Sequence, residues 1–116
     1  SHGVSGSVSI GTGPSKAGNS GGIIIETGKT YDGKSGDISI LNGDGNYFDG
    51  GDIFLTAGRT SEPARHGGRI VLTGGEGSSS HSKDGGDGGP IIITGGEAKG
   101  ENSNDSGGNF EVYGGS

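Results

Sequence analysis

Residues 35–43 read SGDISILNG, and this stretch holds a pattern that recurs along the rest of the chain. Gly36 opens it, Ile38 and Ile40 follow two residues apart, and Gly43 closes it. Apolar side chains two residues apart fall on one face of a β-strand. The stretch therefore predicts a short strand bounded by glycines.

The same motif occurs seven times along the 116 residues, so the chain is built from a repeat. Each copy has apolar residues two and four positions after its opening glycine, and a glycine seven positions after it. Successive opening glycines are 15, 15, 15, 17, 21 and 19 residues apart. They are Gly6, Gly21, Gly36, Gly51, Gly68, Gly89 and Gly108.

The constant orientation of the motif favours parallel strands over a meander. In a meander the glycine ends would alternate between the two edges of the sheet, and nothing would keep the motif in one orientation. A Gly-rich return of about nine residues is also long enough to cross back over a strand of about five. We therefore expect one all-β domain over residues 1–116, a parallel β-solenoid of about seven coils. Each repeat of 15–21 residues would supply one short strand and one Gly-rich return.

The residues between the two inward positions of each strand are expected to face outward, yet several are large and apolar. A contiguous apolar patch on a surface usually marks an interface. Either a return covers this column or another chain does, and we favour another chain. The predicted assembly interface consists of Ile24, Phe54, Val71, Ile92, Leu41 and Tyr113.

The motifs run from within a few residues of Ser1 to Ser116, with no helical or Pro-rich cap. Solenoids normally need polar caps, because their terminal coils expose strand edges. We therefore expect uncapped ends, either for head-to-tail stacking or because the chain was excised from a longer array. Head-to-tail contacts propagate into a filament.

Composition excludes several functional classes. The net charge of −6 opposes binding to nucleic acid or to anionic membrane surfaces, and no apolar run is long enough to span a membrane. Without cysteine the chain can form no disulfide, zinc finger or cysteine nucleophile. Methionine and tryptophan are absent too, and a chain with so few oxidisable side chains suits a long life outside the cell. The predicted location is extracellular or on the cell surface.

Residues 28–35, GKTYDGKS, match the phosphate-binding loop pattern G-x-x-x-x-G-K-[ST]. A functional loop of this kind opens a helix, whose N-terminus and backbone amides hold the phosphates. Here the next residues, GDISI, belong to the third predicted strand. We therefore expect no nucleotide and no other cofactor.

Acidic loops offer a candidate calcium site in Asp44, Asn46, Asp49 and Asp52. These Gly-Asp-rich stretches loosely resemble the calcium-binding repeats of RTX toxins. That family has a nine-residue period with aspartates in phase, whereas the period here is 15 or more and the aspartates are out of phase. A solvated acidic turn is the better interpretation, and we predict no metal site.

The segment SSSHSKDGGD, residues 78–87, brings serine, histidine and aspartate together in the longest return. A loop so rich in glycine cannot hold a catalytic triad rigid. We therefore predict no catalytic residue and no enzyme activity.

Three surface features remain. Thr56, Thr73 and Thr94 form part of an outward threonine column, as in flat ice-binding solenoids, although paired T-x-T rows are missing. Asn104 begins the sequence Asn-Asp-Ser, an N-glycosylation acceptor, so a glycan is possible there. Tyr31 lies in an otherwise polar return, and we expect its ring to pack on a neighbouring coil or chain.

The SG-x-I-x-I-x-TG pattern with Gly/Ser-rich returns resembles repetitive regions of secreted or surface β-solenoid proteins: microbial adhesins, phage fibre parts and algal extracellular proteins. The resemblance covers nearly the whole chain. It implies a non-enzymatic extracellular structural protein, and we expect it to self-associate into a filament or fibre. The alternative is a surface-binding module for ice, carbohydrate or a cell surface.

Overall fold

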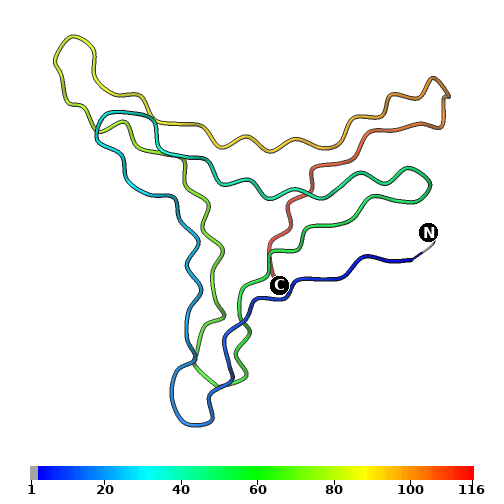
Figure 1. Cartoon of the computed structure of the whole chain (residues 1–116), viewed down its shortest axis with the longest axis horizontal. Coiled ribbons are helices and arrows are strands. Elements are labelled where there is room, and N and C mark those ends of the chain that lie inside the picture. The colour runs from blue at the N-terminus through cyan, green and yellow to red at the C-terminus, as the bar shows by residue number, and fades with distance from the viewer. Residues whose placement is uncertain (1–2) are drawn as a thin grey trace. The chain divides into compact units, whose positions relative to one another are not determined.

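The computed structural model describes residues 3–116, and these residues contain no helix and no β-strand (Figure 1). The prediction of a parallel β-solenoid is therefore wrong. The described residues form five backbone–backbone hydrogen bonds, and each of them lies within a single return. A folded domain has roughly one internal hydrogen bond per residue, so no sheet ladder is present here.

The chain divides into two units, Ser1–Ile53 and Phe54–Ser116. The boundary falls inside the fourth copy of the motif, between its first apolar residue and the next. Each unit contains three of the six returns.

Each return is a loop with a single bend near its middle (Figure 1). We number these loops from 1 to 6. Loops 1 to 3, in the first unit, span residues 12–21, 27–36 and 42–51, and loops 4 to 6 span residues 58–68, 75–89 and 96–108. Their bends lie at residues 16–18, 31–33, 46–48, 62–64, 82–84 and 102–104.

The loops do not cross back over a strand as expected; in five of them a hydrogen bond joins the two ends. In loop 5, for example, the amide of Gly89 donates a hydrogen bond of 2.8 Å to the carbonyl oxygen of Gly75. A coil of a solenoid needs a return whose ends are separated by the width of the coil. Ends that meet cannot form such a coil, so this contact is the local reason that no solenoid forms.

Two loop bends use left-handed backbone. Gly18 in loop 1 has a φ of 154°, which glycine adopts readily because it lacks a Cβ. Ala64 in loop 4 has a φ of 58°, a conformation that is costly for a residue with a Cβ. Pro63 directly precedes it, and its ring fixes the φ at the neighbouring turn position.

The chain buries very little of its surface. It exposes 12143 Å², whereas a compact protein of 11.3 kDa exposes about 5,700 Å² and its unfolded chain about 16,000 Å². No side chain in the described residues is buried, and every large apolar side chain among them is at least 52% exposed. Only 24% of the residues are apolar and 31 are glycine. The conformational entropy lost on ordering the chain therefore exceeds the free energy that internal burial would contribute.

Residues 3–116 include no helix long and apolar enough to cross a membrane.

Candidate functional site

The residues of the predicted assembly interface are all exposed on extended backbone. Ile24 and Leu41 lie in the first unit, and the other four lie in the second. Phe54 is 84% exposed and Val71, the most covered of the six, is 71% exposed. No sheet aligns these six side chains in the described residues, so what they have in common is their position in the repeat.

Exposure still alternates in the four motifs whose outward residue is large and apolar. Ile53 is 52% exposed and its neighbour Phe54 is 84% exposed, and the pair Ile91 and Ile92 differs in the same direction. In these four motifs the residue two positions after the opening glycine is thus partly covered, while the next residue is more exposed; Val8 of the first motif is 89% exposed and does not follow this order. In the four motifs the predicted inward positions are therefore less exposed than the predicted outward ones, although the described residues form no core for the inward side chains to enter.

Loops 1 and 2 are closed by a threonine side chain. The Thr12 hydroxyl donates a hydrogen bond of 3.2 Å to the carbonyl oxygen of Gly21, and Thr27 does the same to Gly36 at 3.3 Å. Each threonine lies six residues after an opening glycine, and each acceptor is the next opening glycine. Loop 3 has Asn42 in the same position, 3.4 Å from the place that a Cβ on Gly51 would occupy.

Loops 4 to 6 are closed by the backbone instead. The amide of the next opening glycine donates to the carbonyl of the glycine that ends the motif: Gly68 to Gly58, Gly89 to Gly75, and Gly108 to Gly96, at 2.8–2.9 Å. In these loops the sixth position holds Ala57, Gly74 or Gly95, which are among the few partly covered residues. A Cβ on Gly74 or Gly95 would collide with a backbone carbonyl across the loop base, so the geometry of loops 5 and 6 requires glycine there, whereas loop 4 makes the same hydrogen bond with Ala57 in this position.

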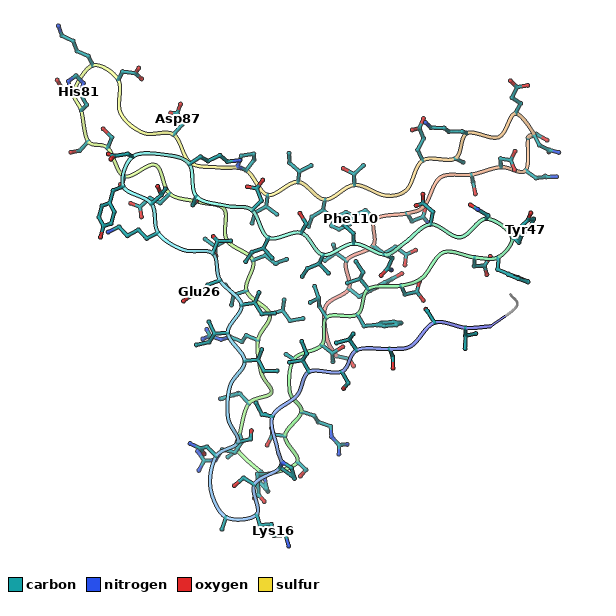
Figure 2. All side chains as sticks on the ribbon, viewed as in Figure 1. Lys16, Glu26, Tyr47, His81, Asp87 and Phe110 are labelled. Carbon is teal, nitrogen blue, oxygen red and sulfur yellow. The ribbon has the colours of Figure 1, made fainter. Side chains whose placement is uncertain are left out.

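The six bends present different chemistry at the loop tips. Figure 2 shows Lys16, Tyr47 and His81 at the outer parts of their loops, whereas Glu26 and Phe110 lie on the extended segments. Tyr31, Tyr47 and Phe48 are all more than 85% exposed in the first unit. The bends of the second unit carry serine, asparagine and charged side chains, together with Pro63 and Ala64 in loop 4.

Loop 2 contains the residues that match the phosphate-binding pattern. Lys34 forms an exposed ion pair of 3.2 Å with Asp37, and the chain after Ser35 stays extended and begins no helix. Tyr31 does not pack on a neighbouring coil. Its ring lies 5.0 Å from the Lys29 ammonium, within the same loop.

Loop 3 holds three of the four candidate calcium ligands, Asp44, Asn46 and Asp49, and Asp52 follows it. Across residues 3–116, no three carboxylate or imidazole side chains come together as a metal site. The part of the chain that the structure describes also encloses no pocket.

The Asn104 sequon lies in the bend of loop 6, and its neighbours fix this bend. Asn102 accepts a hydrogen bond of 3.0 Å from the Asn104 amide through Oδ1, and Asp105 Oδ2 accepts one of 3.1 Å from the Asn102 amide. The Asp105 amide donates to the Asn102 carbonyl at 3.0 Å. The turn thus carries Asn104 at an exposed loop tip.

The last motif carries a row of polar side chains on one face. The Tyr113 hydroxyl donates a hydrogen bond of 2.8 Å to Glu111 Oε2, and Asn109 Nδ2 donates one of 3.4 Å to Glu111 Oε1. The Glu111 carboxylate raises the pKa of Tyr113, because its bond favours the protonated phenol. Phe110 and Val112 alternate with these residues, as the period of two predicts.

Sequence reasoning missed the loop closures and the Tyr113–Glu111 pair. One signal for the closures was present in the sixth position of the motif. It holds a hydrogen-bonding side chain in the first three repeats and a residue no larger than alanine in the next three.

No family model, no curated protein and no solved structure matches the chain.

Proposed function

We propose that this chain is a non-enzymatic extracellular structural protein that self-associates into a filament or fibre. The supporting observation is the exposure of a regularly repeated set of large apolar side chains. The pair in the third motif, Ile38 and Ile40, is 54% and 68% exposed, and every other motif also leaves its apolar pair more than half exposed.

These side chains are exposed to water, so burying them would contribute a large favourable free energy to association. Full burial of a leucine, isoleucine or phenylalanine side chain contributes about 1.5–3 kcal/mol. The chain cannot bury them internally, so contact with another surface is the remaining way to remove them from water. An exposed apolar surface that is repeated along a chain marks such an interaction.

A second copy of the chain is the partner that best fits the repeat. Three apolar pairs recur at a spacing of 15 residues in the first unit, so two copies can match several pairs at once. The outward residues Ile24, Phe54, Val71 and Ile92 add contacts on the other face. Because hydrogen bonds close five of the six loops at their bases, these loops can project beside the contacts without unfolding.

The net charge of −6 acts against this association. Like charges on identical copies repel one another, and salt screens the repulsion over about 10 Å at 0.1 M. Assembly is therefore expected to increase with ionic strength, as well as with protein concentration.

Negative-stain microscopy and sedimentation of the purified chain test the proposal. We expect elongated polymers whose amount rises with concentration and with salt. A monomer that stays soluble at all concentrations and ionic strengths would overturn it. An ice-shaping assay and a glycan-binding assay on such a monomer would then test the alternative, a surface-binding module.

A further inference from the structure

The three tyrosines are the most readily oxidised side chains of this chain, because cysteine, methionine and tryptophan are absent. All three are accessible: Tyr31, Tyr47 and Tyr113 are at least 81% exposed. An oxidant in solution can reach each ring. Their order of reactivity therefore depends on the charged groups around each ring.

Tyr113 has a proton acceptor in place. Its hydroxyl donates a 2.8 Å hydrogen bond to Glu111 Oε2, and Asn109 Nδ2 lies 3.4 Å from the other carboxylate oxygen. Loss of one electron makes a phenol strongly acidic, so the electron and the proton must leave together. A carboxylate already bonded to the phenol accepts that proton without rearrangement, and this lowers the cost of oxidation.

The other two tyrosines lack this arrangement. The Lys29 ammonium lies 5.0 Å from the centre of the Tyr31 ring, and the positive charge disfavours removal of an electron from that ring. Within residues 3–116 the Tyr47 hydroxyl has no hydrogen-bond partner. The expected order of oxidation is Tyr113 first, Tyr47 second and Tyr31 last.

We propose that Tyr113 is a site of oxidative coupling to a second phenol, driven by a peroxide-using oxidant such as a haem peroxidase. Each of two phenols gives up one electron and one proton, and the Tyr113 proton passes to Glu111. The two radicals join through a carbon–carbon bond ortho to the oxygens, and the ring hydrogens then move to the oxygens. The electrons and protons released reduce one hydrogen peroxide to two water molecules.

The second phenol can be a tyrosine of another copy or a separate phenolic compound. The coupling chemistry is the same in both cases. The inference rests on the contacts around Tyr113 and does not require self-association. A labelled small phenol can therefore report the reactivity of the site even when the chain stays monomeric.

The test treats the full chain with a haem peroxidase, limiting hydrogen peroxide and excess biotin-labelled phenol. Trypsin places the three tyrosines on separate peptides, 30–34, 35–59 and 100–116, so mass spectrometry measures each adduct. We expect several-fold more adduct at Tyr113 than at Tyr47, and least at Tyr31. Repeating the reaction with a small photochemical oxidant removes any effect of enzyme access.

Matched variants test the cause of this order. Glu111→Gln keeps a hydrogen-bond acceptor but removes the base, and should lower the Tyr113 adduct to the level of Tyr47. Glu101→Gln, in the same tryptic peptide, should leave the adduct unchanged. Lys29→Gln should raise the adduct at Tyr31.

A second arm omits the labelled phenol and separates the two sources of the coupling partner. Dimers joined through Tyr113 in this arm identify another copy as the partner. Adduct in the first arm with no dimers in the second identifies a separate phenol as the partner. Both outcomes support the site. Equal labelling of Tyr113 and Tyr47 in the wild-type chain, or an adduct unaffected by Glu111→Gln, would overturn the proposal.

Discussion

The hydroxyl of Thr12 lies 3.2 Å from the carbonyl oxygen of Gly21 and joins the two ends of loop 1 with a hydrogen bond. Thr27 and Gly36 repeat this relationship 15 residues later. In the second unit the direction is reversed, and the amide of the opening glycine donates to the carbonyl of the glycine that ends the preceding motif. The loop base is thus the part of the repeat that keeps its structure when the closing group changes.

Thr12→Val should open loop 1, because valine has nearly the shape of threonine but no hydroxyl. A hydrogen bond contributes about 0.5–1.5 kcal/mol net, and an exposed one lies at the low end. The share of molecules in which Thr12 and Gly21 are in contact, measured by the intensity of the nuclear Overhauser effect between them, should therefore fall about twofold. Thr12→Ser should behave like wild type. The same loss of the Thr12–Gly21 contact in Thr56→Val, a change at a threonine without such a bond, would contradict this role for Thr12.

Gly74→Ala and Gly95→Ala should open loops 5 and 6. A Cβ at either position would collide with the carbonyl across the loop base and separate the hydrogen-bonded glycines. The Gly89 amide donates a hydrogen bond of 2.8 Å to the carbonyl oxygen of Gly75. In Gly74→Ala this amide should lose its protection from hydrogen exchange. Gly75→Ala is the matched control, since a Cβ there meets nothing within 4 Å. The same loss in both variants would show that steric closure is not the cause.

The loop boundaries were accessible from sequence because they depend on local chemistry. Gly58 and Gly68, the end of one motif and the start of the next, are the two residues that close loop 4. The alternation that leaves Phe54 more exposed than Ile53 also followed from the period of two. Both features involve residues close together in the chain.

The pairing of segments was not accessible, because the same apolar spacing is compatible with a sheet and with a solvated extended chain. What decides between them is whether burial exceeds the entropy of ordering. With 31 glycines the ordering cost is high, and two apolar residues per motif offset little of it. Tyr113 was predicted as an apolar contact because the hydrogen-bonded partner of a side chain cannot be read from spacing.

Phe54→Asp should weaken self-association, because it places a charge where the proposed contact buries an aromatic ring. Loss of about 2 kcal/mol at each contact corresponds to an association about 30-fold weaker. Sedimentation velocity over a concentration series measures this shift. Phe48→Asp makes the same change at the tip of loop 3, outside the apolar column, and should leave association nearly unchanged. An equal loss of association in both variants would show that the added charge, and not the position of Phe54, weakens the contact.

The phenol of Tyr113 should ionise at a lower pH in Glu111→Gln than in the wild-type chain. The carboxylate holds the pKa of Tyr113 above its usual value, so the hydrogen bond is intact at lower pH and is lost as the pH rises through that pKa. An absorbance titration in a Tyr31→Phe, Tyr47→Phe background observes this phenol alone. An unchanged midpoint in Glu111→Gln would show that the bond does not persist in solution.

Asn104 should receive a glycan when the chain passes through a eukaryotic secretory pathway. The turn formed by Asn102 and Asp105 carries Asn104 at the tip of loop 6, where an enzyme can reach its side chain. Mass spectrometry should find the glycan on peptide 100–116, and Ser106→Ala should remove it while leaving Asn104 in place. Asn109→Gln changes an asparagine of the same peptide that begins no acceptor sequence, and should keep the glycan. A secreted chain with Asn104 unmodified would show that accessibility and sequence are not sufficient at this loop.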